Sequence, residues 1–176
     1  MIRKILGTKD PKISQVCKKV KAIDKKVISI AKDLKETLKA QKEPEGVGLA
    51  STQIGENLRI FAMNDNGKIR VIINPEILEI SKEKAKTPKQ QEKEVMEGCL
   101  SLPNYYGPLK RPQKVKIKYL TLDNVQKEEE FNGLSAQIVQ HEIDHLNGIV
   151  FVHRLLEQKQ PLYQLENDEW VEVELI

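Results

Sequence analysis

The spacing of apolar and polar residues along the chain predicts an amphipathic helix near the N-terminus. Between Asp24 and Gln41, apolar residues recur every three or four positions, as on one face of a helix. These residues are Val27, Ile30, Ala31, Leu34 and Leu38. Asp24 is a typical N-cap residue, and Pro44 follows the end of the pattern. We therefore expect an N-terminal amphipathic helix over residues 24–41.

Strands are predicted after this helix, where the apolar period shortens to two residues. Residues 58–64 and 68–73 flank Asp65-Asn66-Gly67, which is a typical hairpin turn. Pro75 has no backbone N–H, so we expect it to end the second strand and residues 76–80 to form a separate one. This part of the chain therefore predicts an antiparallel hairpin and a further short strand.

The second half of the chain predicts further strands and a second helix. Alternating apolar residues predict strands over residues 115–119, 125–131 and 170–176. Residues 135–146 have helical spacing, with Gly133 or Ser135 near the start and Asn147-Gly148 at the end. The pattern therefore predicts an α+β fold, in which short antiparallel strands pack around two helices.

Composition and charge narrow the class of protein. The chain has 176 residues, 39% of them apolar and 31% charged, which is typical of a single folded domain over residues 1–176. A net charge of +3 does not favour nucleic-acid binding, and residues 81–94, which mix Lys, Glu and Gln, are expected to form an exposed loop. No apolar run is long enough for a signal peptide or a membrane span. We therefore expect a cytoplasmic protein with reduced cysteines, and a monomer by default.

The strongest chemical signal is the segment His141-Glu142-Ile143-Asp144-His145. Helical residues four positions apart lie on one face, so both imidazoles can contact the same metal ion. Glu142 points about 100° away around the helix axis and can accept a proton from a metal-bound water without being a ligand. The alternative is a pair of ordinary histidines, and His153, the third histidine of the chain, is expected to be structural.

Two histidines do not complete a metal site, so a third ligand must come from elsewhere. His153 lies eight residues beyond His145 and past the turn at Gly148, and the metzincin continuation is absent. Cys99, in Glu97-Gly98-Cys99-Leu100-Ser101-Leu102-Pro103, is the better candidate, because thiolate suits soft and borderline metals. A buried cysteine can also be a simple packing residue, which is our interpretation of Cys17.

A glycine-containing segment, Gly46-Val47-Gly48-Leu49-Ala50-Ser51-Thr52-Gln53, follows the first helix. Its spacing fits neither the dinucleotide-binding fingerprint nor a Walker loop. It is either a turn after the helix or a backbone that lies along a substrate, with the Gln53 amide donating to a developing oxyanion. By itself the segment does not decide between these two interpretations.

Together, the three segments resemble the motifs of the peptide deformylase family. Gly46–Gln53, Glu97–Pro103 and Gln140–Gly148 occur in the family's order and at similar separations. The resemblance implies a metal-dependent hydrolase that removes the formyl group from the N-terminal formyl-methionine of nascent polypeptides and releases formate. It also implies one divalent metal ion, typically Fe(II), with zinc, nickel and cobalt as alternatives.

The same resemblance implies roles for individual residues. The implied metal ligands are Cys99, His141 and His145. The implied catalytic groups are Glu142 as general acid/base, with Gln53 and the Leu100 backbone N–H as the oxyanion hole. The backbone expected to pair with the substrate peptide, as with an added strand, is that of Val47, Gly48 and Gly98. Helical periodicity places Leu134 and Ile138 on the same face as the two histidines, where they are expected to line the methionine pocket.

Some features lie outside these motifs. Glu45, Glu97 and Arg111 are expected to form a supporting ion-pair group, although plain surface pairing explains them equally well. Tyr105 and Tyr106 stand where some relatives carry an arginine near the path of the peptide. The tail lacks the long terminal helix of some bacterial members, so any ribosome association is expected to be transient.

Two other functions are compatible with the sequence. A general HExxH-type metallopeptidase would cleave internal peptide bonds and would not need Cys99. A non-catalytic, metal-stabilised binding protein would have a closed site of four ligands, with no position for water. The presence of Glu142 beside a ligand, and of Gln53 without an evident packing role, weighs against this second alternative.

Overall fold

The computed structural model describes residues 1–81 and 96–174. Its helices are α1 (Lys25–Ala40), α2 (Gly133–Leu146), α3 (Phe151–Glu157) and a short 3-10 helix, η1 (Ser51–Ile54). Its strands are β1 (Gly48–Ala50), β2 (Ile60–Asp65), β3 (Lys68–Ile80), β4 (Glu97–Cys99), β5 (Leu102–Gly107), β6 (Lys114–Leu120), β7 (Gln126–Asn132), β8 (Leu162–Glu166) and β9 (Glu169–Val173). None of the described helices combines the length and apolar character needed to cross a membrane.

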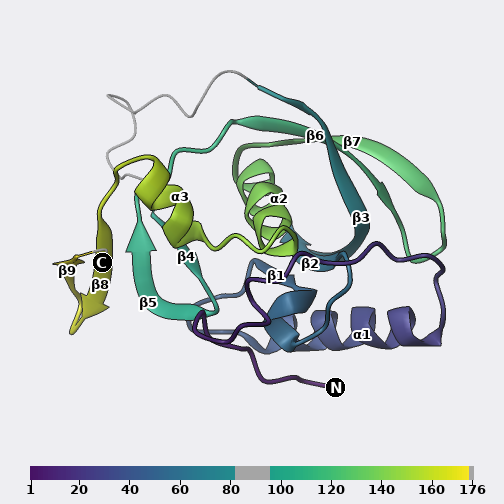
Figure 1. Cartoon of the computed structure of the whole chain (residues 1–176), viewed down its shortest axis with the longest axis horizontal. Helices are drawn as coiled ribbons and strands as arrows, with labels where there is room; N and C mark the ends of the chain where they lie inside the picture. Colours follow the sequence, from purple (N-terminus) through teal and green to yellow (C-terminus); the bar gives the residue numbers. More distant parts are fainter. Residues whose placement is uncertain (82–95, 175–176) are drawn as a thin grey trace.

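The strands form two antiparallel sheets. The larger sheet has the order β1-β2-β3-β6-β7, and the smaller one has the order β4-β5-β8-β9. Figure 1 shows α2 in the middle of the molecule, with strands of the larger sheet on one side and β4 and β5 on the other. The α+β class with antiparallel strands, expected from the sequence, is therefore confirmed.

The helix α1 packs its apolar face against the larger sheet. Asp24 is its N-cap, and the Asp24 carboxylate accepts a hydrogen bond from the Val27 backbone N–H at 2.9 Å. The apolar residues of the helix face are buried together with residues of β2, among them Ile60 and Ala62. Burying such a face stabilises the helix more than its local preferences do.

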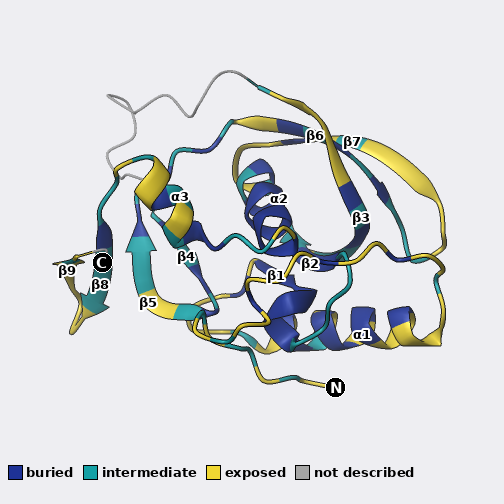
Figure 2. Cartoon of the chain, in the orientation of Figure 1, coloured by how far each residue is buried: buried dark blue, intermediate teal, exposed yellow. Residues whose placement is uncertain are grey.

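The helix α2 is buried along most of its length, as its dark blue colour in Figure 2 shows. Asn132 is its N-cap, and Gly133 has a φ of 56°, a left-handed conformation that favours glycine. The helix therefore begins two residues before the predicted start at Ser135. Ile138 and Val139 belong to a core cluster with side chains of β2, β3, β6 and β7, which fixes the helix against the sheet.

The prediction that Pro75 ends a strand is wrong, because β3 runs without interruption from Lys68 to Ile80. Its pairing with β6 shifts register between Ile73 and Glu76, and Asn74 has a φ of 51°. At a β-bulge, one residue is not paired with the neighbouring strand. The proline, which has no N–H, therefore removes no hydrogen bond between the two strands. The expected hairpin is present, and β2 pairs with β3 on either side of the Asp65-Asn66-Gly67 turn.

Other expected elements are found with small changes in their bounds. The strands expected at 115–119 and 125–131 are β6 and β7, and the C-terminal strand is β9, which ends at Val173. The exposed loop expected over residues 81–94 lies outside the described residues, except for Ser81. Periodicity did not reveal β8 or the short helix α3.

Candidate metal centre and active site

A pocket of about 250 Å³ opens between β1, β4, β5 and α2. Each sheet contributes an edge strand to it, because β1 ends the order of the larger sheet and β4 ends that of the smaller. Gly48 of β1 and Gly98 of β4 line the pocket, together with Val47, which precedes β1. An edge strand presents unpaired backbone N–H and C=O groups, so an extended peptide can pair with it.

Three side chains with metal-binding atoms meet beside this pocket. Cys99 comes from β4, and His141 and His145 come from successive turns of α2. Their candidate ligand atoms lie within 4.8 Å of one another, and Cys99 Sγ is 3.2 Å from His145 Nε2. All three residues are buried, and His145 is completely so. The sequence prediction that these distant residues share one site therefore agrees with the structure.

The chemistry of these donors fits a single divalent ion. Burial opposes ionisation of Cys99, but the neighbouring imidazoles of His145 and His141 hold the pKa of its thiol well below its ordinary value. The thiolate is the form that binds a metal. His141 Nδ1 lies 2.7 Å from Glu97 Oε1, so the other ring nitrogen, Nε2, faces the cluster. One thiolate and two imidazoles would suit a borderline metal ion and would supply three ligands to it.

Glu142 lies next to the cluster but is not part of it. Its side chain lines the pocket, and Oε2 has no hydrogen-bond partner among the described residues. Burial raises the pKa of its carboxyl group to about 7. A Cβ atom at Gly48 would overlap Glu142 Oε1, so only glycine allows this carboxyl group to lie against β1. The group can therefore accept or release a proton near neutral pH.

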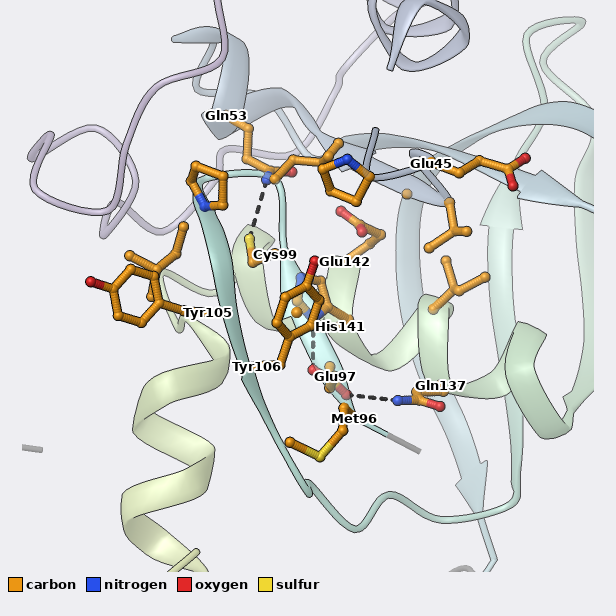
Figure 3. A pocket seen from close by; sticks show the side chains of 18 of the residues that line it. Glu45, Gln53, Met96, Glu97, Cys99, Tyr105, Tyr106, Gln137, His141 and Glu142 are labelled. Carbon is orange, nitrogen blue, oxygen red and sulfur yellow. Dashed lines mark hydrogen bonds and ion pairs between the residues drawn. The ribbon is translucent and has the colours of Figure 1, made fainter. Parts of the chain in front are cut away.

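Gln53 is held in η1 with its amide nitrogen directed at the cluster (Figure 3). Its Oε1 accepts a hydrogen bond from the Ala50 N–H at 2.8 Å. Its Nε2 donates to Ser101 Oγ at 3.1 Å and lies 3.5 Å from Cys99 Sγ. The occupied oxygen fixes the orientation of the amide group, and Leu100 lines the same pocket. Sequence reasoning did not identify Ser101 as the partner of Gln53.

Leu134 and Ile138, which were expected to line a methionine pocket, both lie in the wall of this pocket. Leu134 and Ile138 lie one turn apart on α2, on the side of the pocket that also includes His141. Ile138 is 5% exposed and Leu134 is 62% exposed. The inner part of this wall is therefore already covered by protein, whereas the outer part is open to a ligand.

A buried ion network supports the cluster through Glu97. Arg111 donates to both Glu97 oxygens, at 2.7 and 2.8 Å, and to Asp144 Oδ2 at 2.9 Å. Arg154 of α3 binds both oxygens of Asp144, at 2.7 and 3.1 Å. Burial opposes ionisation of Glu97, but Arg111 and His141 hold the pKa of its carboxyl group well below its ordinary value. The network therefore keeps an ionised acceptor behind the His141 ring.

The predicted membership of this network is partly wrong. Glu45 is exposed and has no ion-pair partner among the described residues, although it lines the pocket. Asp144 occupies the place in the network that was expected for Glu45. It lies three residues after His141 on α2, so its side chain faces a similar direction. The spacing of His141 and Asp144 is visible in the sequence. The contact of Arg154 with Asp144, in contrast, depends on how α3 packs.

The remaining cysteine and histidine lie outside the metal-binding group. Cys17 is buried in the core cluster beside α2, with its sulfur 3.8 Å from Ser51 Oγ. His153 lies in the first turn of α3, and its Nδ1 accepts a hydrogen bond from the Val150 N–H at 3.4 Å. Both side chains therefore have structural partners, in agreement with their expected roles.

Known proteins are similar to this chain in sequence and in architecture. The family described as Polypeptide deformylase matches residues 2–161. The peptide deformylase of Pseudothermotoga lettingae is 42% identical over 86% of this chain and 82% of its own length, and that of Dictyoglomus thermophilum is 40% identical over 90% and 95%. The crystal structure of peptide deformylase from Thermotoga maritima has a TM-score of 0.77 at 33% identity, covering 88% of this chain and 97% of that one.

The family match covers the whole of the larger sheet, and β4 and β5 of the smaller one. The family match includes the segments that carry Gln53, Cys99 and the two histidines of α2. Since the match covers most of the chain and agrees with relatives of 40% identity or more, the chain belongs to the polypeptide deformylase family.

Proposed function

We infer that this chain is a metal-dependent peptide deformylase. It hydrolyses the formyl group from the N-terminal formyl-methionine of nascent polypeptides and releases formate. The observation that carries this conclusion is the cluster of Cys99, His141 and His145 with Glu142 beside it, in a pocket flanked by two edge strands. The family match over residues 2–161 supports the same activity.

We propose that Cys99, His141 and His145 hold one divalent ion, most suitably Fe(II), with zinc, nickel and cobalt as alternatives. Their short mutual distances and the low pKa of the Cys99 thiol support this ligand set. When bound, the ion supplies Lewis acidity, which polarises a carbonyl oxygen and makes a water molecule more acidic. The Glu97 carboxylate keeps the proton of His141 on Nδ1, so that Nε2 stays available as a ligand atom.

Glu142 moves the proton in the proposed reaction. Its carboxylate accepts a proton from the attacking water as the water oxygen bonds to the formyl carbon. It then gives this proton to the peptide nitrogen as the C–N bond breaks, which yields formate and a free amino terminus. Burial of the Glu142 carboxyl group opposes its ionisation, which favours the protonated form that must act in the second step.

The substrate peptide is proposed to lie as an added strand between β1 and β4. Backbone groups at Val47, Gly48 and Gly98 would pair with it, and the methionine side chain would contact Leu134 and Ile138. The open edges of both strands and the apolar wall of the pocket support this placement. Most of the binding groups would then be backbone, which explains how one site can accept many N-terminal sequences.

We also propose an oxyanion hole formed by the Gln53 amide and the Leu100 backbone N–H. If so, Gln53→Leu is expected to raise the activation barrier by about 2.7–4 kcal/mol, mainly through kcat, because the bond strengthens as charge develops. Steady-state kinetics with a formyl-methionyl peptide measure this. Gln53→Glu is the control. It keeps an oxygen that accepts from the Ala50 N–H but lacks the amide N–H donor, so its kcat should also fall. A rise in KM alone would instead make Gln53 a substrate-positioning residue.

Gly48→Ala is expected to reduce turnover by about 10²-fold, because the added methyl group must displace the Glu142 carboxyl group. Kinetics at a fixed metal content test this, with circular dichroism to check the fold. Gly7→Ala is a matched control, since a Cβ there meets only Ser101 O at 3.8 Å and should be tolerated. Equal kcat values in the two variants would show that Glu142 does not need its position against β1.

Five further features are proposals that rest on the sequence and the family. We propose that residues 1–176 form one catalytic domain, in which the buried helix α2 is the metal-binding helix. The protein would be a cytoplasmic monomer, and any contact with the ribosome would be transient. The family match over residues 2–161 supports the single domain.

The direct test of the proposed function is formate release. The protein is loaded anaerobically with one Fe(II), Ni(II) or Zn(II) per chain and incubated with formyl-Met-Ala-Ser, and formate is measured with formate dehydrogenase. We expect formate in proportion to new amino termini, with the Fe(II) form more active than the Zn(II) form. No formate release with any of the three metals would overturn the proposal.

A further inference from the structure

The C-terminal hairpin of β8 and β9 lies beyond the residues that match the family, which end at Pro161. It nevertheless joins the sheet that forms one side of the pocket. β8 pairs with β5, with Tyr106 opposite Tyr163, and β9 pairs with β8. The hairpin is therefore connected to the pocket strand β4 through β5.

Trp170 of β9 makes a specific contact with a pocket residue. Its ring meets that of Tyr106 edge to face, with centroids 5.4 Å apart and planes at 87°. This is a favoured arrangement for two aromatic rings. Trp170 is 51% exposed, so the contact is not a consequence of deep burial. The ring of Tyr106 thus has a partner that comes from the C-terminal hairpin.

The other side of the Tyr106 ring lies against β4. A Cβ atom at Gly98 would lie 2.6 Å from Tyr106 Cδ1, so the ring occupies the place of a Gly98 side chain. Tyr106 lines the pocket, and so does Tyr105, which packs against the cluster that contains Cys99 (Figure 3). Trp170 and the Gly98 backbone together fix the Tyr106 ring at the wall of the pocket.

The alternation of side chains in a strand indicates what this ring would meet. Gly98 and Tyr106 are opposite each other and share one face, whereas Glu97 points to the other face, toward His141. In the proposed function the peptide pairs with the free edge of β4, and its methionine points toward α2. The side chain of the next residue then lies on the face of Tyr106.

We propose that Tyr106, held in place by Trp170, binds the side chain of the residue that follows the formylmethionine. This inference rests on the proposed function. The face of an aromatic ring offers an apolar surface, so the site selects apolar side chains at this position. Trp170 acts through Tyr106 and is a positioning residue, whereas Tyr106 determines specificity.

The test compares two peptides that differ in polarity but little in size, formyl-Met-Leu-Ala and formyl-Met-Asn-Ala. The metal-loaded full-length protein is expected to prefer the leucine peptide by about three- to tenfold in kcat/KM, mainly through KM. Trp170→Ala and Tyr106→Ala should bring this ratio close to one. Trp170→Phe, which retains an aromatic edge, should keep most of the preference.

Val171→Ala is the matched control. Val171 is the neighbour of Trp170 on β9, is also exposed and points to the opposite face of the strand, so the ratio should not change. A general loss of stability lowers the rates for both peptides and leaves their ratio unchanged, which separates a purely structural role from the proposed one. If Trp170→Ala does not fold, Tyr106→Ala still tests the loss of the preference, and Trp170→Phe tests its retention.

Three results would each contradict one of the conclusions. If the unmodified protein releases formate but Tyr106→Ala keeps the full preference for leucine, the inference about Tyr106 and Trp170 is wrong and the proposed function stands. Equal rates for both peptides in the unmodified protein would also overturn the inference alone. If neither peptide yields formate with any metal, the proposed function itself fails.

Discussion

Replacing Glu142 with glutamine is expected to lower kcat by about 10²- to 10⁴-fold, the usual contribution of a general acid/base. Glutamine has nearly the same size but cannot accept the proton of the attacking water. Metal content should not change, because Glu142 lies outside the cluster of Cys99, His141 and His145. Turnover of a formyl-methionyl peptide and metal content by mass spectrometry measure the two effects separately.

The control for this prediction is Cys99→Ala. It removes one of three candidate ligand atoms, so the metal itself should be bound more weakly. The two variants should therefore differ in metal content although both lose activity. Equal loss of metal in Glu142→Gln and Cys99→Ala would show that Glu142 is a ligand and would contradict the proposed roles.

Arg111→Met is expected to reduce the free energy of unfolding by about 3–5 kcal/mol, the usual effect of removing one partner of a buried ion pair. Arg111 makes two hydrogen bonds to Glu97 and one to Asp144, and all three residues are buried. Methionine fills much of the space but leaves the Glu97 charge without its main partner. Urea unfolding of the metal-free protein measures this effect apart from any change in metal binding.

Lys116→Met provides the comparison at the surface. Lys116 Nζ lies 3.2 Å from Glu128 Oε2, with both side chains substantially exposed to solvent. Exposed ion pairs typically contribute at most about 1 kcal/mol, so this variant should lose far less stability. Similar losses in the two variants would mean that burial does not strengthen the Arg111 interactions.

Features that depend on neighbouring residues in the sequence were predictable. The bounds of α1 follow from its apolar period and from Asp24, which caps it in the structure. The hairpin of β2 and β3 follows from Asp65-Asn66-Gly67. The relation between His141 and His145 follows from the geometry of one helix turn, so this half of the candidate site needed no tertiary information.

Features that depend on packing were not predictable from periodicity. Pro75 remains inside β3 because the register shift that accommodates it depends on pairing with β6. The partners of Arg111 depend on where α3 places Arg154 and on the exposure of Glu45, and neither has a local signal. Cys99 was assigned as a ligand by family resemblance, because residues 99 and 141 are brought together only by the fold.

The geometry also bears on the two alternative functions. A metal-stabilised binding protein needs a closed shell of ligands, whereas the cluster in the described residues comprises three, with Glu142 free beside it. A general peptidase must accommodate a long acyl chain on the other side of the scissile bond. The backbone of Gly48 and the Gln53 side chain line the pocket close to the cluster, which favours a very small acyl group.

The ratio of kcat/KM for formyl-Met-Ala-Ser to that for acetyl-Met-Ala-Ser tests the central claim most directly. The acetyl group adds one methyl group where the formyl group has only hydrogen, and overpacking of this kind commonly costs about 1–3 kcal/mol. With the same Fe(II)-loaded protein, we predict that the formyl peptide is preferred by at least about tenfold and that internal peptide bonds are not cut. Comparable kcat/KM values for the two peptides, or cleavage of an internal bond, would contradict the deformylase assignment.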